Sequence, residues 1–512
     1  MKLKRVGFMF TDKGMMSDEP STLIVEQTSP SLNGMSLRRK VYMTVDGYAE
    51  YGVTSLPLDG AITNISEFEK LDGTAYLVAM CEDKAYKYVA GTSTWANIVA
   101  SDFTGDIDDR HEVAVMNDTL ISTNNKDAPR KWTGAGNMSA LSIATFTVAR
   151  IVRPFFDHLC VYNVIEGSRV PMRCRWTDVG TIETWTGGTS GAADMMDGEG
   201  VIMNVLGRED SMIVYKEYSI IAQTYVGGDS IYEFNVMVND VGLKAQGALG
   251  AIGNDQIFLG HEDVYAYVGG RSVKPVGTDV KDELFRTINE AYGYRSVSFV
   301  NRQHTEWTVI VPTTSDYPDT AWTLNYITGV WTRRDLSATA IGYFRKAAAD
   351  VTTIGDLVGT IGQQSWRFGD RDLRVAYPFI LLGNVDGNTY KVDATLHNVD
   401  GSAISSYIET KDFSCPQLSV DQKVRWMEFN MEARGSLLSV EYSVDAGGSW
   451  NSLQAFTLSG DYAKYSYYTN TTSRIIRYRI SCNTLNDWFH LRWMGVGFIP
   501  RGEVDDTIQG DR

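Results

Sequence analysis

The feature that most constrains this chain is a recurring unit of two short strands joined by a polar turn. Each unit starts with an apolar run, passes through a polar or glycine-containing turn, and resumes with alternating aromatic and polar residues. Such alternation is typical of half-buried strands, and Asn-Asp or Asp-Gly between two of them predicts a hairpin. The units lie at residues 76–88, 113–123, 212–222, 256–267, 307–326 and 380–392, with a weaker one at 159–162.

The spacing of these units predicts a β-propeller. The first four begin at residues 76, 113, 212 and 256, and the weaker unit divides the longest interval. A spacing of about 40–50 residues is the period of propeller blades, which are small sheets that bury their faces against neighbouring sheets. An ordinary run of antiparallel hairpins in a sandwich is the alternative, because it needs no regular period.

The chain changes character near residue 396. The strands predicted beyond it are longer, alternate strictly and lie further apart, at residues 405–410, 424–431, 437–443 and 474–480. They predict a separate β-sandwich of about a hundred residues. The expected fold is all-β, a β-propeller with an appended C-terminal β-sandwich domain and one short helix. Its expected parts are an N-terminal arm and first strands (1–60), which dock or close the propeller, then the propeller (61–395), the sandwich (396–500) and a loose acidic tail (501–512).

One segment, residues 279–290, predicts the helix. Its apolar residues recur at helical spacing from Val280 onward. Asp279 is placed to cap the N-terminus of this helix, and Gly293 is placed to end it.

The charge balance indicates which classes of binding partner the chain can have. The 512 residues include 47 Lys and Arg against 63 Asp and Glu, a net charge of −16. A general nucleic-acid-binding surface needs a basic face that displaces counterions, so this balance argues against one. Docking to an acidic partner is one role for the basic residues near the start, and solvated surface charge is the alternative. These candidate docking residues are Lys2, Lys4, Arg5, Arg38, Arg39 and Lys40.

Cysteine usage and hydropathy predict a protein made in a reducing cytoplasm and not exported by a signal peptide. The five cysteines are scattered and lack C-x-x-C spacing, so neither a disulfide framework nor a zinc site is expected. No stretch of the sequence approaches the roughly 18 apolar residues of a membrane span.

An Asp box is the most specific short motif. Residues 443–450 match S-x-D-x-G-x-x-W through Ser443, Asp445, Gly447 and Trp450. Physically this is a hairpin corner, in which the carboxylate accepts backbone N–H groups and glycine permits an unusual φ. The pattern also occurs in sialidases, but a structural turn is the role we expect.

Other chemistry-bearing patterns are weak. Acidic clusters at 106–109 and 194–199 lie in polar loops, where we expect solvated turns, with a loop calcium site or a catalytic carboxylate pair as alternatives. The six histidines form no H-E-x-x-H arrangement, and the sequence has no nucleophile elbow, P-loop or dinucleotide fingerprint. The prediction is a protein that is not an enzyme and uses no cofactor.

One stretch is not explained by composition. Residues 173–185 place Arg173, Arg175, Trp176, Asp178 and Trp185 in the order R-x-R-W-T-D-x-G-x-x-x-x-W. This resembles the R-x-R-W-S-D-x-G-x-x-x-x-W motif of the tail nozzle (tail hub) proteins of short-tailed bacteriophages (podoviruses), the packaged-DNA stabilisation family. Later segments follow in the same order as in that family, so that the resemblance spans residues 170–450: 202–207, 211–225, 227–234, 242–253, 265–270, 275–284 and 401–410.

The resemblance implies a structural virion protein. Members of that family are propeller-based subunits that form a ring below the portal and its adaptor, retain packaged DNA, conduct it during ejection and offer attachment surfaces to spikes or fibres. It therefore implies a homo-oligomeric ring, a hexamer. The implied partners are the portal adaptor (head–tail connector), the tail spikes or fibres and passing genomic DNA, and the implied location is the virion tail after synthesis in the host cytoplasm.

Two observations on the residues are compatible with this implication. An acidic chain suits a DNA conduit, because it repels phosphate. The motif residues Arg175, Trp176 and Trp185 are expected to be architectural, locking a blade or a seam between domains by stacking and hydrogen bonding.

Two other functions stay open. A propeller-based glycan-binding or glycan-cleaving tail protein would have a cleft with clustered aromatic side chains and a carboxylate pair, and the tryptophan-rich segment 322–331 favours it. A cellular propeller scaffold would carry regular W-D or kelch signatures, which the sequence lacks.

Overall fold

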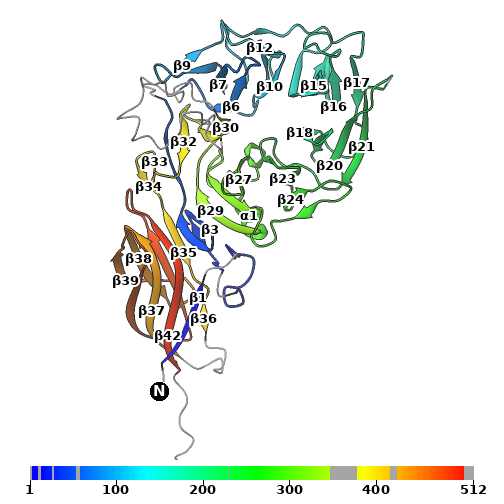
Figure 1. Ribbon diagram of the computed structural model, residues 1–512. Helices are drawn as coiled ribbons and strands as arrows, with labels where there is room; N and C mark the ends of the chain where they lie inside the picture. The colour runs from blue at the N-terminus through cyan, green and yellow to red at the C-terminus, as the bar shows by residue number, and fades with distance from the viewer. Residues whose placement is uncertain are drawn as a thin grey trace, which may run out of the picture.

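The computed structural model describes residues 3–9, 13–25, 28–52, 58–228, 230–345, 378–414 and 424–500. Within these residues, seven sheets are arranged in a ring and two more form a sandwich beside it (Figure 1). The predicted all-β fold, a propeller with a sandwich, is confirmed. None of the described helices is long and apolar enough to cross a membrane.

The ring is a propeller whose blades follow one another along the chain. Six of its sheets are four-stranded and antiparallel, with consecutive strands as neighbours. Blade 1 consists of β6 (Ile62–Glu69), β7 (Ala75–Cys81), β8 (Ala85–Val89) and β9 (Thr94–Asn97). Blade 2 consists of β10 (Glu112–Met116), β11 (Thr119–Thr123), β12 (Arg130–Trp132) and β13 (Ser139–Ala140). Blade 3 consists of β14 (Val148–Phe155), β15 (His158–Glu166), β16 (Ser168–Trp176) and β17 (Gly191–Asp194). Blade 4 consists of β18 (Ile202–Arg208), β19 (Ser211–Lys216), β20 (Ser219–Tyr225) and β21 (Tyr232–Asn239). Blade 5 consists of β22 (Leu249–Ile252), β23 (Asp255–Leu259), β24 (Val264–Tyr267) and β25 (Lys274–Pro275). Blade 6 consists of β26 (Val297–Asn301), β27 (Glu306–Val311), β28 (Thr320–Asn325) and β29 (Val330–Asp335).

Blade 7 closes the ring with a strand from the beginning of the chain. Its sheet has the order β30-β31-β32-β5-β33-β34, so that β5 pairs with β32 although more than 300 residues separate them. Closure of this kind removes the exposed edges that an open ring would leave. The bounds are β30 (Ala340–Phe344), β31 (Phe379–Gly383), β32 (Thr389–Asp393), β5 (Gly47–Glu50), β33 (Asn398–Val399) and β34 (Ser402–Ala403).

All six of the stronger predicted strand–turn–strand units form antiparallel hairpins. In the unit at 113–123, Asn117 and Asp118 both adopt positive φ, which is the conformation of a two-residue hairpin turn. The predicted spacing is irregular for a structural reason. The unit at 113 is the first and second strand of its blade, whereas the other five are second and third strands.

Each seam between neighbouring blades of the described chain is filled by a hydrophobic core, and six of the seven cores are separate clusters. Blade 1 meets blade 2 around Phe68 and Trp132, and blade 7 meets blade 1 around Leu381 and Ile62. Because every blade buries both faces, the strands carry apolar side chains on both sides, which explains runs such as Trp307–Val311 with all residues buried.

The sandwich consists of two six-stranded sheets that share one core. The first sheet has the order β3-β4-β42-β37-β40, with β1 also paired to β42, and the second has the order β2-β35-β41-β38-β39, with β36 also paired to β41. The first-sheet bounds are β1 (Lys4–Met9), β3 (Met35–Arg38), β4 (Val41–Thr44), β42 (Phe489–Pro500), β37 (Val424–Gly435) and β40 (Ala463–Ser473). The second-sheet bounds are β2 (Leu32–Asn33), β35 (Ser406–Glu409), β41 (Ile475–Cys482), β38 (Leu437–Ser443), β39 (Asn451–Thr457) and β36 (Phe413–Ser414).

The described part of residues 1–60 contributes strands to both domains. Strands β1 to β4 complete the sandwich and β5 completes the propeller, so the same segment belongs to both domains. The sandwich core is also continuous with the seam between blades 5 and 6, through Ile257 and Trp307 on the propeller side and Trp426 and Tyr478 in the sandwich. The expected tail at 501–512 lies outside the described residues.

The helix is shorter than predicted and is capped differently. Helix α1 runs over Lys281–Thr287, and a short 3-10 turn, η1, over Gly293–Arg295. Asp279 does not cap α1. Instead, the carboxylate of Asp18 accepts the backbone N–H of Asp282 at 2.9 Å. A residue far away in the sequence therefore caps the N-terminus of the helix.

Candidate functional site

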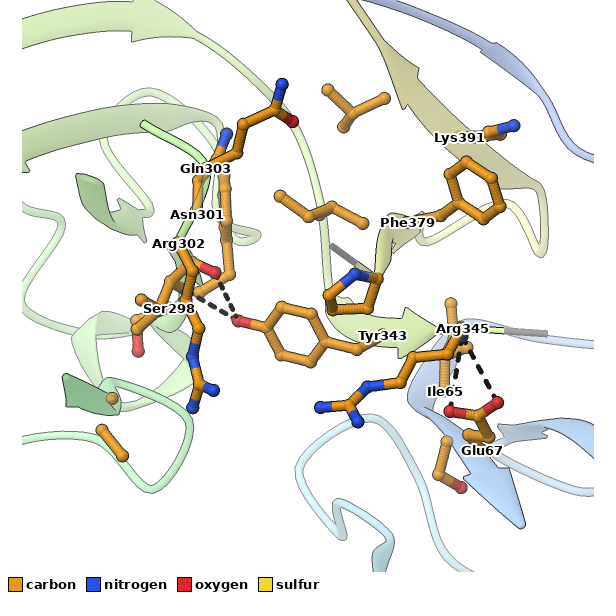
Figure 2. A pocket seen from close by; sticks show the side chains of 18 of the residues that line it. Ile65, Glu67, Ser298, Asn301, Arg302, Gln303, Tyr343, Arg345, Phe379 and Lys391 are labelled. Carbon is orange, nitrogen blue, oxygen red and sulfur yellow. Dashed lines mark hydrogen bonds between the residues drawn. The ribbon is translucent and has the colours of Figure 1, made fainter. Parts of the chain in front are cut away.

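A large hollow lies on the propeller axis. It has a volume of about 910 Å³ and is lined by the inner strands of several blades and by the outer part of blade 7. Figure 2 shows Tyr343 reaching across it from β30. A volume of this size and a few convergent polar groups are typical of small-molecule binding sites.

Tyr343 joins two blades at this cavity. Its hydroxyl accepts the backbone N–H of Val300 at 2.6 Å and donates to the Val300 carbonyl at 3.2 Å. Burial raises the pKa of this phenol. Tyr343 therefore fixes the width of the cavity between blades 6 and 7.

Charged side chains of both signs surround the cavity. The guanidinium groups of Arg302 and Arg345 project into the open space below Tyr343 (Figure 2). The carboxylate of Glu67 accepts the backbone N–H of Arg345 at 3.3 Å, and the Lys391 ammonium lies 3.6 Å from the centre of the Phe379 ring. This arrangement can bind a polar group through several donors. Among the described residues, no cluster of His, Cys, Asp and Glu is arranged to hold a metal ion.

The opposite end of the axis is packed with buried polar groups. Arg110, just before β10, donates to the Thr339 carbonyl at 2.7 Å, and Arg150 donates to the Gln246 amide oxygen at 2.8 Å. Gln246 in turn donates to Glu112 at 3.0 Å. Burial lowers the pKa of both Arg110 and Arg150. This network ties four blades together where the inner strands begin.

The residues of the motif at 173–185 lie in blade 3, and its two arginines form ion pairs from β16. Glu166 accepts from Arg173 at 2.8 Å and from Arg175 at 2.8 Å, and Arg173 also pairs with Asp194 at 2.6 Å. Although burial opposes ionisation, the two guanidinium groups lower the pKa of Glu166. The motif arginines thus brace β15, β16 and β17 against one another.

The two motif tryptophans lie on opposite sides of blade 3. Trp176 packs in the seam with blade 4, and its indole N–H donates to the Thr189 carbonyl at 2.9 Å. Trp185 packs in the seam with blade 2, edge-on to Phe146. Asp178 accepts the backbone N–H of Thr189 at 2.8 Å, which fixes the loop between them. These contacts are of the architectural kind expected from the sequence.

The Asp box forms the turn between β38 and β39. Asp445 accepts the Ser443 hydroxyl at 2.6 Å and the Ser449 backbone N–H at 2.8 Å, and these hydrogen bonds lower its pKa to about 2. Gly447 has φ of 92°, in the left-handed region that favours glycine. The guanidinium carbon of Arg479 lies 3.9 Å from the centre of the Trp450 ring. The hydrogen bonds that the Asp445 carboxylate accepts here all come from residues of the turn itself.

The candidate docking residues have different surroundings. Lys2 lies outside the described residues, and Arg5 pairs with Glu428 at 2.8 Å. Arg38 is only 14% exposed and pairs with Asp46 and Glu306, so it holds the junction of the two domains instead of presenting a free charge. The remaining candidates, Lys4, Arg39 and Lys40, are exposed.

A lysine that sequence reasoning missed, at the end of β19, reaches into the second acidic loop. Lys216 is fully buried, and its ammonium donates to the carbonyls of Met195 at 3.1 Å and Asp197 at 3.4 Å, and also to that of Gly198. A built-in cation therefore binds this loop, for which calcium was one of the sequence alternatives. The only local signal is a lysine at the end of an apolar strand, Ser211–Lys216.

Comparisons with known proteins show only distant likeness. No protein-family model matches the chain, and no curated protein does. The structure is similar to the Pan2 WD40 domain of Neurospora crassa, at 9% identity over 70% of this chain and 96% of that chain, with a TM-score of 0.39. It is also similar to apo AztD from Citrobacter koseri, at 10% identity over 60% of this chain and 80% of that one (TM-score 0.36). A third likeness is to the exo-beta-1,3-galactanase of Phanerochaete chrysosporium, at 9% identity over 75% of this chain and 95% of that chain, with a TM-score of 0.23. Likenesses this distant carry no argument about function, which leaves the chain's own geometry as the basis for one.

Proposed function

We propose that this chain is a structural subunit of a short-tailed bacteriophage tail. It forms the nozzle (hub) ring below the portal and adaptor, retains packaged DNA, conducts it during ejection and carries attachment surfaces for spikes or fibres. The observation that carries the proposal is the motif at 173–185, by which the sequence resembles that family. Its arginines and tryptophans brace one blade and fill the seams on both sides of it.

The way the two domains are joined supports a structural role. The N-terminal segment supplies strands to both sandwich sheets and to blade 7, and one core runs from blades 5 and 6 into the sandwich. A unit built in this way resists bending at the junction, because motion there would break strand pairing and open a packed core. Rigid subunits suit a ring closed by heterologous contacts.

The electrostatics and the axis fit a conduit between subunits. The packed polar network at one end of the propeller axis favours passage of DNA through the lumen of the ring over passage through a single propeller. With a net charge of −16, subunits would repel the phosphates of DNA and let it slide.

Electron microscopy of reconstituted particles tests this function. The purified chain is mixed with DNA-filled, tail-less capsids that lack it. The expected result is a ring of added density below the portal, together with retention of DNA that otherwise leaks. Unchanged portal vertices with continued leakage would rule out the nozzle function.

A further inference from the structure

The outer face of the first sandwich sheet has a composition unlike the rest of the surface. Its partner face packs in the core through side chains such as Phe429, Met431, Met494 and Val496, so the alternating residues point outward. The strand register brings these outward residues into three rows. The rows are Arg5, Gly497, Glu428 and Tyr468; Gly7, Gly495, Asn430 and Ser466; and Trp493, Glu432 and Lys464.

Glycines make room for a flat tryptophan on this face. A Cβ at Gly7 would lie 2.7 Å from the Trp493 ring, and a Cβ at Gly495 would lie 3.0 Å from it. The indole therefore lies across two neighbouring strands, close to their backbone. Glycine weakens a strand interior, and where it persists it often marks a place where a ring or a ligand approaches the backbone closely.

A hollow of about 310 Å³ adjoins the indole. Its lining includes Trp493 and Tyr468, and Tyr468 is 75% exposed. Two aromatic side chains on one open sheet face, one lying flat and one free at the rim, offer ring faces to a ligand at little entropic cost.

Hydrogen-bonding groups beside the rings are already fixed in position. Arg5 and Glu428 form two parallel hydrogen bonds, at 2.8 and 3.0 Å, across Gly497. Ser466 donates to the Asn430 side-chain oxygen at 2.6 Å. These pairs leave further donors and acceptors, namely the remaining guanidinium N–H groups, the second lone pairs of the carboxylate and the Asn430 amide N–H groups.

The charge of this face favours a neutral ligand. Each cation beside the indole has a carboxylate near it: Arg5 pairs with Glu428, Arg492 pairs with Glu432 at 3.4 Å, and Lys464 lies opposite the same Glu432 in the register. A nucleic-acid strand would need unpaired cations for its phosphates, whereas Arg5 and Arg492 are already paired with carboxylates. A ligand with both C–H faces and hydroxyl groups matches the rings and the fixed polar pairs together.

We infer that this outer face is a binding site for a neutral saccharide chain, with the C–H face of a sugar ring packed on Trp493 and its neighbour against Tyr468. Arg5, Glu428 and Asn430 hydrogen-bond the hydroxyl groups. The site goes beyond the proposed conduit role and gives the subunit a contact with a surface polysaccharide.

Affinity electrophoresis of the full chain in native gels tests the site. The gels contain dextran, glycogen, hydroxyethyl cellulose or a soluble β-glucan, and a gel without polysaccharide is the reference. At least one polysaccharide should retard the chain. Trp493→Ala and Tyr468→Ala should each weaken that retardation about tenfold, the loss of one stacking contact. Tyr218→Ala, which removes an exposed aromatic ring on blade 4, is the matched control and should not change it.

Two further measurements keep the result clear. Gly7→Ala retains the indole but tilts it away from the sheet, so it should weaken binding while the melting temperature of the chain stays unchanged. No retardation in any of the gels overturns the site, as does equal retardation of the parent and a folded Trp493→Ala chain. If Trp493→Ala instead changes only the oligomeric state in sedimentation, the face is a contact between copies and the saccharide site is wrong.

Discussion

Arg38, on sandwich strand β3, donates two hydrogen bonds to Glu306 on propeller strand β27, at 2.9 and 3.1 Å. The same guanidinium pairs with Asp46 at 3.0 Å, in the segment that leads into blade 7. Although burial opposes ionisation of Asp46, the charge of Arg38 lowers its pKa. One side chain therefore connects the sandwich, blade 6 and the closing strand.

Arg38→Met should destabilise the protein by about 3–5 kcal/mol, because it leaves two buried carboxylates without their cation. Equilibrium urea unfolding measures the change. Arg39→Met, the exposed neighbour in the β3–β4 turn, is the control and should fall within about 0.5 kcal/mol of the parent. Equal stability of the two variants would contradict the role given to Arg38.

Trp176→Ala should lower the free energy of unfolding by about 3–5 kcal/mol, since the indole is buried in the seam between blades 3 and 4. Differential scanning calorimetry follows the change, with the half-exposed Val179→Ala as the matched control in the same loop region. A Trp176→Ala chain that melts like its parent would show that the motif does not hold the blades together.

Lys216→Met should loosen the loop at 194–199. The variant retains the apolar stem but leaves the carbonyls of Met195 and Gly198 without their donor, a loss of about 1–3 kcal/mol. Hydrogen exchange should show faster exchange in that loop and little change in blade 1. Lys274→Met, at an exposed position on β25, serves as the control, and loop protection equal to the parent's would refute the anchoring role.

His111 should make stability depend on pH. Burial lowers its pKa from the ordinary 6.5 to about 3, and the nearby Asp127, Arg130 and Arg110 modify that shift. Between these values the unfolded chain binds a proton that the folded chain does not, so stability falls as pH falls from 6.5 toward about 3. The slope is about 1.4 kcal/mol per pH unit for this one group.

Urea unfolding of His111→Gln measures this slope at several pH values between about 7 and about 5. In the variant, the slope of the unfolding free energy against pH should be smaller by the contribution of about one proton. Its stability at neutral pH should also drop, because the 2.8 Å hydrogen bond between Thr63 and His111 is lost. Parallel pH profiles for the parent and the variant would disprove the assignment.

The sequence predicted the local part of the fold and missed the parts made by distant residues. Hairpins were predictable because alternation and turn residues lie within a few positions of one another, as in the unit containing Asn117 and Asp118. The capping of α1 was predicted wrongly, because Asp18 lies more than 260 residues from the helix it caps.

The candidate sites divide in the same way. The Asp-box turn could be predicted from eight consecutive residues, whereas the axial cavity joins side chains from several blades and has no local pattern. The three rows around Trp493 were equally hidden, because their alignment depends on pairing among β1, β37, β40 and β42. A spacing rule within one segment cannot reveal contacts of this kind.

The position of β5 has a consequence for synthesis on the ribosome. The strand emerges early, but its partner β32 follows only after residue 389, and β1 and β4 wait still longer for β42. Strands β1, β2 and β5 therefore stay without their partner strands while six blades are made, and such exposed strand edges are targets for chaperones and for misassembly. Completion of both domains becomes a late event: a chain interrupted before β32 could not close the propeller, and a chain interrupted before β42 would lack a central strand of the first sandwich sheet.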